Sequence, residues 1–434
     1  MIATKTVNML YGQAGMELSV PAGACILEGQ HPPALANADQ AVRDALQRPI
    51  GCASLSQLVR NRRPGSVAIT ISDITRPVPN KQFLPPMLAV LNAAGVADSQ
   101  IVIIVGTGMH RPTTPDELDI LVGPDIRSRV EIIDHRAADA DTLTTVSDTP
   151  PVRVCRRFAQ ADFRIVTGYI EPHFMAGFSG GRKGVCPALV DLATLQRFHG
   201  YAALADQRAD NGVLAGNPCH EIALKVARVV GVDFLFNVAI THDRRIAGIY
   251  CGDLEQAHQA GCRQVAGWTS ATIDRPFDLV ITNGGGYPLD QTLYQAVKGM
   301  CTALPALNAE STLLIVSHCG EKVGSDAYTS LMLRYDNNWK RFLADIAQSG
   351  QTALDQWEFQ MHCRVLARIG LNKLILATDG IDSAMQAHLS LTPAGGEGDA
   401  QARAQRVIDS YIARCPAARI AVIPGGPYTM LRTR

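Results

Sequence analysis

The sequence predicts an α/β fold with two domains, each a mostly parallel β-sheet flanked by helices, and an active site in the interdomain cleft. Short apolar runs rich in β-branched residues alternate with helical segments, a pattern typical of parallel sheets covered by helices. The pattern starts afresh near Pro276, and 434 residues exceed the size of one ordinary core. Polar segments marked by glycine or proline follow several predicted strands directly, and doubly wound sheets bind their ligands at such strand ends.

The first predicted domain covers residues 1–270. Its first 30 residues alternate weakly between apolar and polar side chains and are expected to form short strands. Ser54 carries a side chain that is preferred at the N-cap of a helix. The motif THDRR separates two apolar runs, which predicts a hairpin. Strands are predicted at 67–71, 101–105, 130–133, 163–167, 234–239 and 246–251, and helices at 38–47, 54–61, 81–94, 115–121, 192–198, 219–230 and 254–266.

The second predicted domain covers residues 276–423, and the segment 270–275 is its boundary with the first. Its C-terminal tail, about residues 424–434, is expected to pack back on the first domain. The motif AGGEG (394–398) is predicted to be an exposed loop. Strands are predicted at 277–282, 312–317, 373–378 and 419–423, with a helix at 291–300 after the first of them.

Composition excludes several classes of partner. Forty basic and forty acidic residues cancel, so the overall charge favours neither a nucleic acid nor a membrane surface. The chain has no run of about 18 apolar residues, and its N-terminus lacks the apolar region of a signal peptide. The eleven cysteines include no C-x-x-C pair, which fits a reducing compartment better than a disulfide framework. We therefore expect a cytoplasmic protein with no nucleic acid and no membrane partner.

Four polar segments follow directly from predicted buried strands. They are DITRP (73–77), GTGMHRP (106–112), the stretch 168–200, and NGGGYP (283–288). Because ligands bind outside the carboxyl ends of strands in doubly wound sheets, these segments are expected to face one cleft. Binding sites also concentrate where two domains meet.

The first two segments carry groups suited to an anion and to proton transfer. Asp73, Thr75 and Arg76 precede a predicted helix start, where free N–H groups and an arginine fork would bind carboxylate or phosphate. The alternative is an ordinary capped turn in which Asp73 bonds backbone amides. His110 sits in a glycine-containing loop and is suited to proton transfer near neutral pH. The alternative for His110 is a surface or capping histidine.

The stretch 168–200 holds six glycines together with a base, an amine and a potential metal ligand. Glycine lets backbone approach a ligand closely, and the three reactive side chains are His173, Lys183 and His199. Their spacing matches neither H-E-x-x-H nor finger-type zinc sites, and Gly184 after the lysine excludes a phosphate-binding P-loop. Lys183 is therefore an anion contact or a point of covalent attachment. The alternative is a solvated Lys/Arg pair with two incidental histidines.

A helix of the second domain adds further polar side chains. Tyr294 and Lys298 are four residues apart and share a face, with Gln295 beside them. The alternative is a routine exposed face of an amphipathic helix. Trp357 and Gln360, three residues apart in DQWEFQ, give a weaker signal of the same kind.

Together these segments resemble one family, the nickel-pincer nucleotide-dependent lactate racemases with their 2-hydroxy acid racemase and epimerase relatives. The resemblance rests on DITRP (73–77), GTGMHRP (106–112), EPHFMAGFSGGRKG (171–184), His199 and LYQAVKG (293–299), with Trp357 and Gln360 in support. These motifs run in the family's order over about two thirds of the chain. Pro187-Ala188 departs from the Pro-Gly that relatives commonly have there, which concerns a turn rather than a reacting group.

The resemblance implies a role for each of these residues. The implied cofactor is Ni(II) held by a nickel-pincer nucleotide, pyridinium-3-thioamide-5-thiocarboxylic acid mononucleotide. Lys183 would be joined to this nucleotide, and His199 would complete the nickel coordination. His110 and His173 match the paired acid/base histidines. The remaining roles are assigned as follows: Arg76, Lys298, Gln295 and Tyr294 to the substrate, and Asp73, Thr75, Arg76, Tyr294, Gln295, Lys298 and Trp357 to the cofactor.

The implied reaction inverts C2 of a 2-hydroxy acid. One histidine takes the hydroxyl proton while hydride leaves C2 for the cofactor; the 2-oxo acid rotates, recovers the hydride on its other face and gains a proton from the other histidine. The resemblance also implies maturation by cofactor-biosynthesis proteins. Two alternatives remain open: a zinc-dependent hydrolase or lyase using His110, His173 and His199, and a non-catalytic hydroxy acid-binding homologue. The residues do not distinguish lactate from longer aliphatic, aromatic, malate-like or sugar acids.

Overall fold

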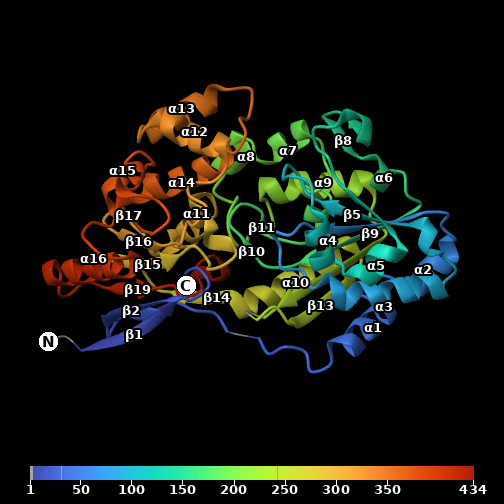
Figure 1. Cartoon of the computed structure of the whole chain (residues 1–434), viewed down its shortest axis with the longest axis horizontal. Helices are drawn as coiled ribbons and strands as arrows, with labels where there is room; N and C mark the ends of the chain where they lie inside the picture. Colours follow the sequence, from blue (N-terminus) through green and yellow to red (C-terminus); the bar gives the residue numbers. More distant parts are fainter. Residues whose placement is uncertain (1–2, 31, 242) are drawn as a thin grey trace.

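Two six-stranded sheets organise the protein, one in each half of the sequence (Figure 1). The computed structural model describes residues 3–30, 32–241 and 243–434. In the first sheet the spatial order is β13-β12-β9-β4-β5-β6, and all neighbours are parallel except the hairpin of β12 and β13. The strands of this sheet are β4 (Val67–Ser72), β5 (Ile101–Gly106), β6 (Glu131–Asp134), β9 (Phe163–Tyr169), β12 (Phe234–Ile240) and β13 (Ile246–Gly252).

Helices cover both faces of this sheet, which explains the continuous apolar runs of its central strands. Along β4 successive side chains point to opposite faces, so Ile69 packs with Phe83 and Leu84 while Ala68 packs with Val166 and Phe198. The predicted strands, helices and hairpin of this half are confirmed, although His242 of THDRR lies outside the described residues. The helices are α1 (Ala38–Gln47), α2 (Leu55–Arg62), α3 (Asn80–Ala93), α4 (Pro115–Leu121), α5 (Pro124–Arg129), α6 (Arg156–Ala159), α7 (Leu192–Phe198), α8 (Tyr201–Ala205), α9 (Pro218–Val230) and α10 (Leu254–Thr269).

Helix starts in both halves are set by side-chain caps. The Ser54 hydroxyl accepts from the Gln57 amide, as the sequence predicts. In the second half the helix expected at 291–300 begins later, at Leu293, because Thr292 caps it by accepting from the Gln295 amide. The residues just before it form a short 3₁₀ turn, η4 (Leu289–Gln291).

The second sheet is parallel throughout and has the order β18-β17-β16-β15-β19-β3. Its strands are β3 (Cys25–Ile26), β15 (Leu279–Asn283), β16 (Thr312–Val316), β17 (Leu374–Ala377), β18 (Thr392–Pro393) and β19 (Ile420–Val422). Its helices are α11 (Leu293–Thr302), α12 (Asp326–Tyr335), α13 (Trp339–Gln348), α14 (Gln356–Ile369), α15 (Ser383–Gln386) and α16 (Ala400–Arg414). The α/β fold class with mostly parallel, helix-flanked sheets is thus confirmed.

The start of the chain belongs spatially to the second sheet. A hairpin of β1 (Thr4–Met9) and β2 (Met16–Pro21) buries Leu18 and Val20 in one cluster with Leu279 and Ile281, and β3 pairs with β19. Figure 1 shows this hairpin beside α16, far from α1 and α2. Residues 3–27 therefore add no strand to the first sheet, because their apolar side chains fit the face of the second, and the domain bounds 1–270 stay a prediction.

The predicted boundary 270–275 and the tail are paired with each other. β14 (Ser270–Ile273) lies parallel to β20 (Met430–Thr433). Met430 is buried in a cluster with Ile170 and Tyr250 of the first half. The division into independently folding domains stays a prediction, since one hydrophobic cluster contains Val166 and Phe198 of the first half together with Trp357 of the second.

Two structural facts concern the cysteines and the helices. All eleven cysteines are free thiols, and eight of them are buried. No helix in the described part of the chain combines the length and the apolar character that crossing a membrane requires.

Candidate active site

Three of the four polar segments leave neighbouring strands of the first sheet. DITRP follows β4, GTGMHRP follows β5, and the stretch 168–200 begins inside β9; β9, β4 and β5 are adjacent and parallel. Because the carboxyl ends of parallel strands share one edge of the sheet, these segments meet there. The prediction that these three segments emerge at the same edge of the sheet is confirmed.

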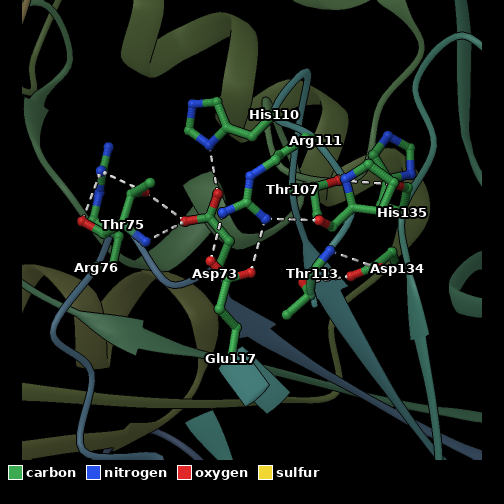
Figure 2. Close-up of polar contacts among 11 residues, drawn as sticks. Asp73, Thr75, Arg76, Thr107, His110, Arg111, Thr113, Glu117, Asp134 and His135 are labelled. Carbon is green, nitrogen blue, oxygen red and sulfur yellow. Dashed lines mark hydrogen bonds and ion pairs between the residues drawn. The ribbon is translucent and has the colours of Figure 1, made fainter. Parts of the chain in front are cut away.

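His110 is held by a carboxylate from the neighbouring strand end. Its Nδ1 lies 2.5 Å from Oδ2 of Asp73, as Figure 2 shows. A carboxylate only accepts hydrogen bonds, so Nδ1 carries the hydrogen and Nε2 keeps its lone pair. The side chain is 54% exposed, which leaves the ring open to a small molecule. His110 is therefore set up to accept a proton at Nε2.

Asp73 uses both of its oxygens within this loop. Oδ1 accepts from the Thr75 hydroxyl (2.5 Å) and the Thr75 amide (3.2 Å), and Oδ2 holds His110. Burial alone would raise the pKa of Asp73, but the hydrogen bond and charge of His110, with the charge of Arg76, keep it below its ordinary value. The capped turn that the sequence allowed is real, and the second oxygen positions the histidine.

Arg76 keeps its charge in this environment. Its guanidinium donates to the Thr75 carbonyl (3.3 Å) and hydroxyl (3.0 Å). Burial lowers the pKa of Arg76, but Tyr169, Glu171 and Asp73 raise it above its ordinary value. An arginine so placed can meet the carboxylate or phosphate of a ligand.

Two polar contacts fix the loop that carries His110 (Figure 2). Arg111 donates to both carboxylate oxygens of Glu117, at 2.9 and 2.6 Å, and these bonds lower the pKa of Glu117 to about 2. Thr113 donates from its amide and its hydroxyl to Asp134, at 3.0 and 2.7 Å. The loop is thereby tied to α4 and to the end of β6, which limits the positions that His110 can take.

His173 is a buried histidine with different partners. It lies on β10 (Pro172–His173), which pairs with β11 (Gly177–Phe178). Its Nδ1 accepts from the amides of Met175 and Ala176, both at 3.2 Å, so Nε2 carries the hydrogen of the neutral ring. Burial, followed by the charges of Lys183, Lys298 and Arg76, holds the pKa of His173 well below its ordinary value. The ring is therefore neutral at physiological pH.

The glycines before Lys183 are required by the backbone. Gly180 and Gly181 have φ angles of +74° and +56°, and a Cβ on Gly181 would lie 2.5 Å from the His258 ring. The Gly181 amide donates to Asn237 Oδ1 (2.7 Å), which anchors the turn to β12. The chain then forms η3 (Gly181–Gly184) and presents Lys183.

Arg182 is buried and stabilises this turn, so Arg182 and Lys183 are not a solvated pair. Its side chain is 1% exposed and donates to the carbonyls of Phe178 (2.9 Å) and Ala176 (2.6 Å). Burial lowers the pKa of Arg182 to about 10, so it remains charged at neutral pH. This role could not be predicted from the motif GGRKG, because a surface arginine and a buried one look alike there.

Replacing Arg182 with methionine should destabilise the protein by about 3–5 kcal/mol, because several buried carbonyls lose their donor. Denaturant unfolding of the purified chain measures the effect. Arg228→Met is the matched control, since Arg228 is 61% exposed and pairs only at the surface, and it should change stability by less than about 0.5 kcal/mol. Equal midpoints for the two variants would contradict the supporting role of Arg182.

Lys183 is an amine in a cationic, partly buried setting. Its Nζ lies 6.0 Å from the centre of the Phe198 ring. Burial and the charges of Arg76, Arg182 and Lys298 lower the pKa of Lys183 well below its ordinary value, while Glu171 opposes them. A lysine with a lowered pKa has a larger neutral, nucleophilic fraction, which suits covalent attachment.

His199 presents one free nitrogen. Its Nδ1 donates to the Leu195 carbonyl (3.2 Å), which leaves the Nε2 lone pair available. Burial and the charge of Lys183 lower the pKa of His199 to about 3, so the ring is neutral. It stacks on Trp357 from the second half, with ring centres 4.6 Å apart. A neutral, oriented imidazole is the form that binds a metal.

Helices α11 and α14 from the second half of the chain form the other wall of the candidate active site. Trp357 Nε1 donates to the Tyr294 hydroxyl (2.8 Å), which joins α14 to α11. Gln360 donates to the Tyr201 carbonyl (3.0 Å) and so holds α14 against α8. Gln295 Oε1 is buried and has no hydrogen-bond partner among the described residues, so it can accept from a ligand.

The glycine loop NGGGYP leads into η4 and α11. Its Tyr287 lines a separate open cavity of about 510 Å³ with Tyr11, His318 and Asp379. Only the following helix, α11, brings Tyr294, Gln295 and Lys298 to the site. The expectation that NGGGYP faces the same cleft as the other three segments stays a prediction.

Sequence reasoning missed three acidic residues of the site: Glu171, Asp355 and Glu358. Glu171 raises the pKa of Arg76, and Glu358 contributes to raising that of Tyr294. Asp355 is placed so that the charge of His110 lowers its pKa, although burial keeps it above its ordinary value. Each of these acidic residues lies within two positions of a predicted site residue, His173 or Trp357. That closeness in the sequence is the one feature that could have indicated them.

The three site histidines do not form a conventional metal centre. Within residues 3–30, 32–241 and 243–434, no three His, Cys, Asp or Glu side chains are placed to hold a metal together. The zinc hydrolase or lyase alternative is therefore not favoured.

The fold and the site define a two-domain α/β enzyme whose reactive side chains meet between its two halves. The family model of the lactate racemase N-terminal domain matches residues 11–212, and that of the lactate racemase C-terminal domain matches residues 273–430. The chain belongs to the lactate racemase family, as the motifs indicated.

Individual relatives agree with this assignment. The lactate racemase of Lactiplantibacillus plantarum is 34% identical over 394 residues, which are 89% of this chain and 89% of that protein. That of Thermoanaerobacterium thermosaccharolyticum is 30% identical over 400 residues, 91% of this chain and 90% of that one. The lactate racemase apoprotein structure from the latter organism superposes with a TM-score of 0.88 at 27% identity, covering 99% of this chain and 100% of that one. A Thermotoga maritima protein of 17% identity shares the fold, with a TM-score of 0.66 over 91% of this chain and 98% of that one.

Proposed function

We propose that this enzyme, an isomerase of the racemase type, inverts C2 of a small 2-hydroxy acid, with lactate as the first candidate. The observation that carries the proposal is the contrast between two histidines from different strand ends. His110 has a carboxylate behind Nδ1 and an open Nε2, whereas His173 is buried, neutral and bonded to backbone amides. Two separately held bases can serve the two faces of C2, which one base cannot do in line.

The substrate carboxylate has cationic partners nearby. Arg76 and Lys298 both act on the pKa of His173, so their charges lie around the same ring. Held by these groups, a 2-hydroxy acid presents its hydroxyl to a histidine, with Gln295 and Tyr294 as further contacts. Longer, aromatic, malate-like and sugar acids belong to the same substrate class.

Lys183 and His199 fit the nickel-pincer nucleotide that the family resemblance implies. The nucleotide brings its own sulfur and carbon donors, so the protein needs to supply one neutral nitrogen and a point of attachment. His199 Nε2 and the Lys183 amine match that requirement, and the lack of a three-ligand cluster in the described chain agrees with it. When bound, Ni(II) and this nucleotide supply the hydride acceptor. Asp73, Thr75, Arg76, Tyr294, Gln295, Lys298 and Trp357 are proposed to hold it.

Three further expectations complete the proposal. Cofactor-biosynthesis proteins mature the chain, since the nucleotide is not a common metabolite. The protein works in the cytoplasm. Its partners include neither nucleic acid nor membrane, in keeping with its balanced charge.

The test uses the full chain co-produced with cofactor-making enzymes. Enantiopure L- and D-lactate, and then a panel of other 2-hydroxy acids, are supplied separately and their enantiomers resolved with time. We expect inversion from both sides, about one nickel per chain, and a mass increase on the Lys183 peptide that Lys183→Arg lacks. Protein that carries the nucleotide but inverts no 2-hydroxy acid would refute the function; stoichiometric zinc without a nucleotide would restore the metallohydrolase alternative.

A further inference from the structure

Helix α14 of the second half carries a stripe of three side chains that reach the first half. Trp357, Gln360 and Arg364 occupy positions i, i+3 and i+7 of this helix, which places them along one side of it. Trp357 and Gln360 are 4% and 2% exposed, and Arg364 is half-buried. Because buried polar groups are nearly always hydrogen-bonded, the partners of this stripe indicate what it does.

All three side chains contact one short stretch of the first half, residues 199–209. The partners are the His199 ring, whose centre is 4.6 Å from that of Trp357, the Tyr201 carbonyl, 3.0 Å from Gln360 Nε2, and the Ala209 carbonyl, 2.6 Å from Arg364 Nη1. The stripe therefore follows the chain from His199 onward. We call Trp357, Gln360 and Arg364 the α14 clamp.

The first half gives this stretch few polar contacts of its own. Among the described residues, no side chain of the first half donates to a backbone carbonyl of residues 199–209. His199 Nδ1 donates to the Leu195 carbonyl one turn before it, at 3.2 Å. Arg208 pairs with Asp206 inside the stretch, at 2.6 Å. The side-chain hydrogen bonds that hold the backbone of residues 199–209 therefore come from the second half.

A further contact with the second half lies on the other side of His199 in the sequence. Gln196, on the last turn of α7, donates from Nε2 to the carbonyl of Thr352, which lies just before α14. This bond measures 2.7 Å. The clamp is itself anchored in its own half, since Trp357 Nε1 donates to the Tyr294 hydroxyl of α11 at 2.8 Å. The His199 ring thus belongs to the first half and is held in place by the second.

A histidine that binds a metal has to be held at a fixed position and orientation. Replacing the residues that support such a ligand typically lowers metal affinity by about 10–100-fold. Nε2 of His199 is the one protein nitrogen proposed here to bind nickel, so the other donors do not replace it when residues 199–209 are displaced.

We propose that Arg364 and Gln360 are positioning residues for His199: they hold residues 199–209 against α14 and so keep Nε2 in the place from which it binds nickel. The effect on nickel rests on the proposed function, whereas the effect on the backbone of residues 199–209 does not. Neither Arg364 nor Gln360 touches substrate or cofactor in this assignment. Retention of the metal then depends on contact between the two halves.

The first experiment uses the full chain without cofactor. Amide hydrogen exchange, followed by mass spectrometry of peptides, is compared among wild type, Arg364→Met, Arg364→Lys and Gln360→Leu. Arg368→Met is the matched control, because Arg368 lies one turn further along the same helix and donates to the Leu307 carbonyl of its own half at 3.1 Å. Peptides from β9 report on the first sheet and should exchange equally in all variants.

We expect Arg364→Met to speed exchange in residues 200–209 roughly tenfold, because the Ala209 carbonyl loses a charged donor and the stretch opens more often. Gln360→Leu should act in the same direction but less, since its bond is neutral. Arg364→Lys should restore part of the protection, because an ammonium group still donates. If the methionine variant does not fold, Gln360→Leu and Arg364→Lys are compared with the control in its place. Exchange as slow as in Arg368→Met would overturn the clamp.

The second experiment uses protein that carries the nickel-pincer nucleotide, verified by the mass of the Lys183 peptide. A chelator is added and the release of nickel is followed with time. Arg364→Met should release nickel about tenfold faster than wild type and Arg368→Met, and Arg364→Lys should restore part of the retention. Faster exchange with unchanged release would overturn the positioning of His199.

The failure of this inference differs from that of the proposed function. Loaded protein that shows both effects of Arg364→Met but inverts no 2-hydroxy acid would support the positioning role and refute only the proposed function. An active racemase in which Arg364→Met changes neither exchange nor nickel release would overturn the positioning role alone.

Discussion

Replacing either His110 or His173 with alanine should abolish inversion of both enantiomers of the substrate by cofactor-loaded protein. Each histidine handles one proton of the reaction, so loss of either stops both directions. General acid–base catalysis contributes about 10²–10⁴-fold, and a decrease of at least that size is expected. The assay follows chirality in deuterated water, where wild type should invert C2 without incorporating deuterium there.

The chain offers a close control for this experiment. His388 pairs with Asp336 through Nδ1 at 2.6 Å, as His110 pairs with Asp73, but it is exposed and lies on the second half away from the site. His388→Ala should retain full activity. Full activity in both site variants would contradict the assignment of the two bases.

Replacing Asp73 with asparagine should lower kcat by about 10²-fold or more while KM changes little. The neutral amide no longer stabilises a charged His110 ring and no longer dictates which nitrogen carries the hydrogen. Because the pKa of Asp73 is held below its ordinary value, the carboxylate stays charged as pH falls from 7 to 5. Protonation of Asp73 should therefore not lower wild-type kcat between pH 7 and pH 5.

Cofactor content must be measured in the Asp73 variant, since the same residue is a proposed cofactor contact. A normal mass of the Lys183 peptide with a low kcat supports the positioning role. Asp336→Asn is the matched control, and it should leave kcat unchanged. A loaded Asp73→Asn enzyme with wild-type kcat would show that the hydrogen bond to His110 is dispensable.

The strand ends could be predicted from the sequence because local patterns determine them. Apolar runs such as 67–71 and 101–105 mark buried parallel strands, and the segments after them must emerge at one edge. The rule places the segments that carry His110 and His173 at that edge, whereas Lys183 and His199 lie further along the chain, on η3 and after α7. Their chemical roles came from the family resemblance.

Other features depend on packing between distant segments, which local patterns do not contain. The burial of Arg182 requires carbonyls that only the folded turn brings together, and that of Glu358 requires α11 to lie on α14. The place of the first hairpin depends on a fit to Leu279 and Ile281, late in the chain.

The pairing of β3 with β19 has a consequence for biosynthesis. β3 is synthesised before every strand of the first sheet, whereas its partner β19 is synthesised after all of them. The first sheet contains only residues 67–252 and can close while translation continues, as domains generally do. The hairpin of β1 and β2 keeps its apolar face uncovered until β15 and β19 have been made, so a product truncated before them would expose that face.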